Sequence, residues 1–159
     1  MMLCSGSLSV SGGFSSGHPS VIVATGITRR GSFSVSIICL GLYTVVRTQT
    51  MGNLQLYSVI VTRSDEMKRK LAPAHFNQPM VTEAPVVLTV CADFNRTTKW
   101  AECRKAHPGY DNILSFLNAA TDALLYTQTF CNLADEEGLG YCYLGTTVYN
   151  PQVIIDKRL

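Results

Sequence analysis

Charged residues are scarce in this chain of 159 residues, at 15% of the sequence, and acidic residues are missing altogether before Asp65. The formal net charge of +2 is too small to indicate a nucleic-acid partner. No apolar run reaches the roughly 18 residues that a membrane-spanning helix needs. The longest run, 37–46, is interrupted by Gly41 and Thr44. Because 47% of the residues are hydrophobic, we expect a folded chain. The small net charge and the short apolar runs predict no nucleic-acid partner and no membrane span.

The uneven distribution of acidic residues divides the chain near residue 50. The first fifty residues contain three arginines, ten serines and seven glycines, whereas ten basic and all eleven acidic residues follow them. Serine and glycine provide little apolar surface to offset the entropy of an ordered chain. We therefore expect residues 1–49 to be a low-complexity or non-homologous segment and residues 50–159 to form the domain.

The six cysteines give no sign of a disulfide framework, because their spacings match no compact pattern of bridges. The N-terminus also lacks the basic residues that precede the apolar core of a secretory signal. Thiols stay reduced in the cytoplasm. The sequence thus predicts free cysteines and a cytoplasmic protein.

Regular elements become clear after residue 50. Residues 54–61 are rich in β-branched and aromatic side chains and predict a strand. A short helix follows, with Ser64 as its N-cap and Pro73 as its stop. After a loop over 74–84, the near-continuous apolar run 86–91 predicts a strand covered on both faces.

The second half is dominated by one long helix. We expect it to begin at Asp111, to run to about Glu137 and to end at Gly138 in a left-handed conformation. A short helix near 100–105 precedes it and a strand at 141–144 follows. The predicted apolar face has helical spacing and comprises Ile113, Phe116, Leu117, Ala120, Leu124, Thr127 and Cys131. The element order predicts an α/β or α+β layer with this helix in the core. Residues 21–24 and 34–46 have strand-like composition without a clear period.

Two segments are candidates for ligand binding. Residues 50–55 read Thr-Met-Gly-Asn-Leu-Gln, and their two carboxamides at alternate positions point to one side if the strand has begun. Residues 138–145 read Gly-Leu-Gly-Tyr-Cys-Tyr-Leu-Gly, where Gly145 allows a flat ligand to approach the backbone. Taken singly, each segment is explained better by a structural turn than by ligand binding. No nucleophile-elbow, phosphate-loop or metal-site spacing is present in the sequence.

Read together in chain order, these segments resemble the nitroreductase family of FMN-dependent NAD(P)H oxidoreductases. Residues 50–55 are similar to the family's Ser-Ser-x-Asn-x-Gln flavin segment, and 56–61 to the strand that it leads into. Residues 83–88, Glu-Ala-Pro-Val-Val-Leu, resemble the family's Ala-Pro strand entry, and the Cys-Ala-Asp at 91–93 resembles the end of that strand. The long helix and 138–145 resemble the stretch whose backbone lines the flavin ring.

The resemblance implies an α+β sandwich of a mixed sheet with helices that works as an intertwined homodimer. FMN would lie at the dimer interface, take electrons from NAD(P)H and pass them to a small nitroaromatic or quinone-type acceptor. No side-chain acid or nucleophile is required for this chemistry. The implied cofactor-binding residues are Thr50, Gly52, Asn53, Gln55, Tyr143, Leu144 and Gly145, with Arg29 and Arg30 as the nearest match to the family's Arg-Arg-Ser-x-Arg-like phosphate motif.

The match to the family is incomplete at both ends. The two arginines lack the later basic residue of the motif, and family members continue past the equivalent of Leu159. The sequence therefore predicts a partial nitroreductase-like domain. The alternative is a truncated, catalytically silent remnant that binds flavin weakly or associates with intact relatives. A third interpretation is an unrelated α/β binding module.

Overall fold

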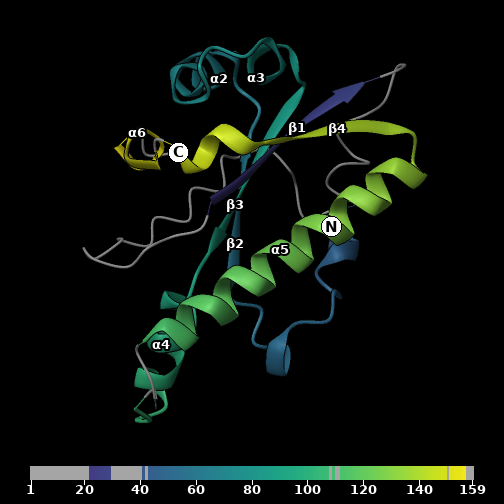
Figure 1. Cartoon of the computed structure of the whole chain (residues 1–159). Helices are drawn as coiled ribbons and strands as arrows, with labels where there is room; N and C mark the ends of the chain where they lie inside the picture. Colours follow the sequence, from purple (N-terminus) through teal and green to yellow (C-terminus); the bar gives the residue numbers. More distant parts are fainter. Residues whose placement is uncertain are drawn as a thin grey trace.

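The backbone forms a four-stranded sheet with helices against it, in a computed structural model that describes residues 22–29, 41, 43–107, 109, 112–149 and 151–156 (Figure 1). The elements in chain order are β1 (Ile22–Arg29), η1 (Met51–Asn53), β2 (Tyr57–Thr62), α2 (Asp65–Leu71), η2 (Ala72–His75), α3 (Pro79–Glu83), β3 (Val86–Ala92), α4 (Asn95–Cys103), α5 (Ile113–Glu136), β4 (Leu139–Leu144), η3 (Gly145–Val148) and α6 (Pro151–Asp156). None of the helices among these residues is both long and apolar enough to cross a bilayer.

The strands are ordered β2-β3-β1-β4, and each neighbouring pair is antiparallel. Tyr57 pairs with Ala92, while Ala24 pairs with Thr89 on one side and Leu144 on the other. The predicted α+β class is confirmed. The pairings in the described part of the sheet are antiparallel throughout, whereas the resemblance implied a mixed sheet.

Strand β1 holds an inner position although it precedes residue 50. Its backbone pairs with β3 and β4, which are distant from it in sequence. The strand-like composition of 21–24 thus marked a strand that extends to Arg29. By contrast, residues 43–45 are helical and not the strand that we expected over 34–46. The division of the chain at residue 49 remains a prediction.

Two apolar clusters cover opposite faces of β3, which is buried along nearly its whole length. Val86, Leu88 and Val90 pack with the buried face of α5, which runs diagonally across the strands in Figure 1. Val87 packs with residues of α2, η2, α3 and α6. This arrangement confirms the prediction of a strand covered on both faces, and it follows from the alternation of side chains along a strand.

The short elements agree with the sequence in part. Strand β2 begins at Tyr57, three residues later than expected, and α2 lies where Ser64 and Pro73 placed it. The predicted loop over 74–84 is wrong, because η2 and α3 occupy most of it. The proline that starts α3 has the fixed φ that suits a first helical turn, so it lies at the beginning of a helix and does not interrupt one.

Helix α5 is confirmed, although its cap and its buried face differ from the prediction. Asn112 is its N-cap, with its side-chain oxygen accepting a hydrogen bond from the Leu114 N–H at 2.9 Å. The expected cap, Asp111, lies outside the described residues. Gly138 ends the helix with φ of 71°, as expected. Of the predicted apolar face, Ile113, Leu117 and Leu124 are exposed, because small residues such as Ala119 and Ala123 form the side that packs on the sheet.

Candidate functional site

The segment before β2 is a tight turn with three left-handed residues. Gly52, Asn53 and Gln55 have φ values of 57°, 55° and 52°. Glycine adopts this conformation freely, but for asparagine and glutamine it carries a cost of about 1–3 kcal/mol each. Other contacts must therefore hold the turn in place.

A buried aspartate of α5 supplies the main contact. Asp122 accepts the Met51 N–H at 3.0 Å through Oδ1 and the Leu56 N–H at 3.1 Å through Oδ2. Its side chain is fully buried. One carboxyl group thus fixes both ends of the 51–56 turn. The sequence analysis missed Asp122, although a lone acidic residue in the apolar stretch 119–125 was a signal that could have identified it.

Gln55 makes hydrogen bonds that stabilise the turn. Its side-chain nitrogen donates to the Val46 carbonyl at 2.8 Å, and its N–H donates to Thr50 Oγ1 at 3.3 Å. Its own carbonyl oxygen accepts a hydrogen bond from the Arg96 guanidinium of α4. Gln55 therefore joins the turn to α4 and to the chain before it.

The expected alternation of Asn53 and Gln55 along a strand is wrong, because the strand starts only at Tyr57. Asn53 ends η1 and is exposed. Gly52 is exposed, and Thr50, in extended backbone, leads into η1. The structure brings these four predicted residues together in one turn, and their role toward a ligand remains a prediction.

The second predicted segment follows the opposite edge strand. Tyr143 is 40% exposed, and its hydroxyl donates to Gln128 Oε1 of α5 at 3.1 Å. Leu144 is buried in the cluster with Val87, so its side chain is committed to the core. Gly145 is exposed, and a Cβ at this position would meet no atom within 4 Å. The space beside the Gly145 backbone is open, and its role toward a flat ligand remains a prediction.

A buried histidine supports the turn after Leu144. His75 Nδ1 lies 2.8 Å from Thr146 Oγ1 and ties η2 to η3. The side chain is completely buried, and burial lowers the pKa of His75 because it disfavours the charged ring. A neutral His75 therefore holds the turn that carries Gly145.

The two predicted segments lie at opposite edges of the described sheet. The turn around Asn53 leads into β2, Gly145 follows β4, and β3 and β1 lie between these strands. Three strand spacings amount to about 14 Å, several times the length of a hydrogen bond. The space between them is filled by strands and their covering helices. Within one chain the two segments are therefore separated by the width of the described sheet.

The backbone of Arg29, one of the two predicted phosphate ligands, lies far along the sheet from Gly145. Arg29 is the last residue of β1 and pairs with Leu139, whereas Leu144 pairs with Ala24, five residues back along β1. At about 3.4 Å per residue this separates the two levels by about 17 Å. Arg30 lies outside the described residues.

Several known proteins are similar to this chain in sequence or in fold. No family model matches the chain. A crystal structure of a Bacteroides fragilis protein assigned to the oxidoreductases is 59% identical, with a TM-score of 0.77 over 82% of this chain and 53% of that one. The NfrA1 nitroreductase of Bacillus subtilis is 27% identical, with a TM-score of 0.73 over 79% of this chain and 51% of that one. An FMN reductase (NADPH) of Bacillus subtilis is 34% identical over 98 residues, 60% of this chain and 39% of that protein.

The chain is thus similar in sequence to an FMN reductase and in α+β fold to solved oxidoreductase and nitroreductase chains. The resemblance to the nitroreductase family is confirmed in sequence and in fold. The structural likeness spans about half the length of the two solved chains, and the sequence match spans 39% of the FMN reductase.

Proposed function

We propose that this chain is an FMN-dependent oxidoreductase that passes electrons from NAD(P)H to nitroaromatic or quinone-type acceptors. One observation carries the proposal: the two segments that resemble flavin-binding sequence lie at opposite edges of one sheet, where each could contribute to a site shared between two chains. The names of the relatives, FMN reductase and nitroreductase, support the same cofactor and reductant. The acceptor class rests on the resemblance alone.

The exposed backbone and side chains of the two segments are suited to contact a flat cofactor. The open backbone at Gly145 and the exposed ring of Tyr143 would pack against it from one chain. Thr50, Gly52, Asn53 and Gln55 would supply the other side from the second chain, with Asp122 holding their turn. When bound, FMN accepts a hydride from NAD(P)H and releases electrons to the acceptor. We assign no proton donor or nucleophile to the chain.

The homodimer in this proposal is supported by an apolar stripe on α5. Leu114, Leu117, Leu124 and Leu125 are each 44–51% exposed, and Ile113 is 69% exposed. Contiguous apolar surface of this kind marks interaction sites in folded proteins. We propose that a second copy of the chain covers the α5 stripe, which we define by these five residues.

A cytoplasmic location also belongs to this proposal. Four cysteines of the described chain are free thiols, namely Cys91, Cys103, Cys131 and Cys142. Free thiols are typical of proteins in a reducing compartment. They support the cytoplasm as the compartment in which this chain acts.

The test is flavin retention followed by turnover. The purified chain is mixed with FMN and desalted, and its visible absorption is recorded. NADH and NADPH oxidation is then followed with and without a quinone or a nitroaromatic compound. We expect about one FMN per chain and acceptor-dependent oxidation. Gly145→Val should lower FMN retention while leaving the fold intact, and Gly109→Val, at another exposed glycine with open space around it, should not.

The competing function is that of a silent flavin-fold chain that only associates with intact relatives. A colourless but cooperatively folded protein, inactive with added FMN, would contradict the oxidoreductase proposal and favour this alternative. Co-purification with a full-length relative would then support it.

A further inference from the structure

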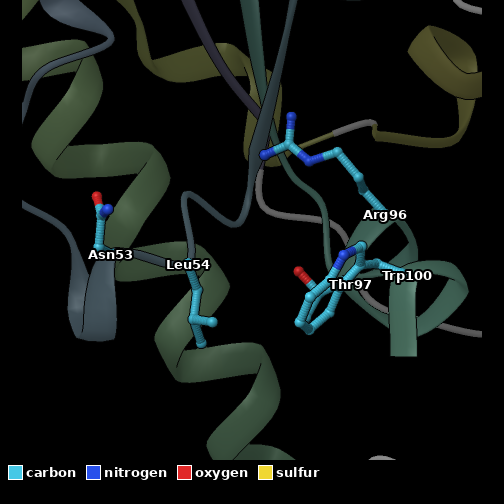
Figure 2. Close-up of a pocket in the computed structure, with 5 residues that line it drawn as sticks. All are labelled: Asn53, Leu54, Arg96, Thr97 and Trp100. Carbon is cyan, nitrogen blue, oxygen red and sulfur yellow. The ribbon is translucent and has the colours of Figure 1, made fainter. Parts of the chain in front are cut away.

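A hollow lies between the turn before β2 and helix α4. Its volume is about 290 Å³, and it is lined by Asn53, Leu54, Arg96, Thr97 and Trp100. Figure 2 shows Leu54 between Asn53 and the α4 side chains, with Thr97 and Trp100 facing it across the gap. We call it the Arg96–Trp100 hollow. Only Asn53 belongs to the predicted flavin residues.

The hollow combines an aromatic surface with a fixed cation. Trp100 is 61% exposed, which is high for so large an apolar ring. The Arg96 guanidinium donates to the Gln55 carbonyl, and this bond orients the group. A guanidinium carries five N–H donors in a planar fork, so one such bond leaves capacity for an anion.

The surrounding charge favours an anionic ligand. The Arg104 guanidinium lies 5.8 Å from the centroid of the Trp100 ring. The acidic neighbour Asp93 is occupied, because its carboxylate accepts the Ser58 hydroxyl and the Asn95 N–H. No carboxylate in the described part of the chain forms an ion pair with Arg96.

The size of the hollow limits what it can bind. Pockets for small molecules usually measure about 300–1,000 Å³, so this one lies just below that range. It suits one base with a phosphate and is too small for a whole dinucleotide. Stacking of a base on an aromatic ring beside an arginine is a recurrent way to bind nucleotides.

We propose that the Arg96–Trp100 hollow binds the adenosine phosphate part of NAD(P)H, with the base on Trp100 and a phosphate on Arg96. This assignment rests on the proposed function, because NAD(P)H is the reductant that the proposed function names. The hollow adjoins the Asn53 turn, so a ligand bound here would lie beside the residues proposed to contact flavin.

Trp100 makes the test direct, because it is the only tryptophan in the sequence. The purified chain is titrated with 5′-AMP and 2′-AMP, with and without FMN, and the tryptophan emission is recorded. We expect a saturable change that persists when FMN is present. Arg96→Gln should weaken binding about tenfold or more, the usual effect of losing a hydrogen bond to a charged group. Lys99→Gln removes the same charge from the same helix outside the lining and should change the affinity little.

The outcomes separate this inference from the proposed function. Calorimetry of Trp100→Ala, with circular dichroism to confirm the fold, should also show weakened AMP binding. The inference is overturned by the absence of saturable binding, by equal effects of Arg96→Gln and Lys99→Gln, or by FMN displacing AMP one for one. AMP binding in a chain that retains no FMN would support the hollow and contradict only the oxidoreductase proposal.

Discussion

Asp122 is the residue on which the candidate site depends most. It is buried in α5 and accepts two backbone N–H groups from the ends of the 51–56 turn. That turn contains three left-handed residues, two of which are not glycine. A carboxyl group with two acceptor oxygens stabilises this backbone in a way that few other side chains can.

Asp122→Asn tests this role. The amide group offers only one acceptor oxygen, so either the Met51 or the Leu56 N–H loses its partner. We expect the free energy of unfolding to fall by about 1.5–3 kcal/mol, as for loss of a hydrogen bond to a charged group. Urea unfolding measures the change. Asp135→Asn, at an exposed position of the same helix, is the control and should stay within about 0.5 kcal/mol. Equal stability of the Asp122 variant and the parent would contradict the role.

Helix α5 has one apolar side that packs on the sheet and another that is exposed. Its alanines pack closely on the sheet, and Tyr126 and Phe130 fill the same cluster. The exposed α5 stripe lies on a different side of the helix. A 24-residue helix with apolar residues on more than one side has more apolar surface than the described sheet covers.

Leu117→Glu combined with Leu124→Glu tests the α5 stripe. Two buried, unpaired carboxylates at an apolar interface oppose association, so we expect the dimer to dissociate to monomers that lose FMN. Analytical ultracentrifugation measures the mass, and the absorption spectrum measures the flavin. Arg69→Glu on the exposed side of α2 is a control that leaves the mass unchanged. A double variant that remains dimeric would show that the stripe is not the interface.

At the scale of the whole molecule, the position of β1 determines how much of the chain is needed to fold. The strand lies between β3 and β4, so its removal leaves both without a neighbour on that side. Unpaired strand edges promote aggregation. We expect a fragment of residues 50–159 to show no cooperative thermal unfolding by circular dichroism, while the full chain does. A cooperatively folded fragment would instead support the predicted division at residue 49.

The fold as a whole should also weaken at alkaline pH. Burial raises the pKa of the Cys91 thiol from 9.0 to about 11, with Asp93 nearby adding to the shift, and burial also raises the pKa of Tyr57 and Tyr126. The unfolded chain then loses these protons first, so stability is full below about pH 9 and declines as the pH rises toward 11. Urea unfolding across this range should show the decline. Cys91→Ser should reduce it and Cys103→Ser, at an exposed thiol, should not; an unchanged slope in the Cys91 variant would contradict this assignment.

Much of the architecture could be predicted because it depends on local chemistry. Ser64 precedes α2, Gly138 follows α5 and the apolar run 86–91 forms a buried strand, and each depends on neighbours close in sequence. Ser64 marks the start of α2 by its position, since its side chain makes no capping hydrogen bond. The two segments of the candidate site were recognisable for the same reason. Local signals also misled, since the alternation of Asn53 and Gln55 suggested a strand that starts only at Tyr57.

Residue patterns were enough to assign the α+β class, the order of the main elements after residue 50 and the resemblance to nitroreductases. Packing between distant segments was needed to show that Ile22–Arg29 is an inner strand, that Asp122 holds the 51–56 turn and that the two site segments lie at opposite edges of the sheet. Strand pairing and buried hydrogen bonds join residues far apart in the chain, and their partners are chosen by packing, which no local pattern records.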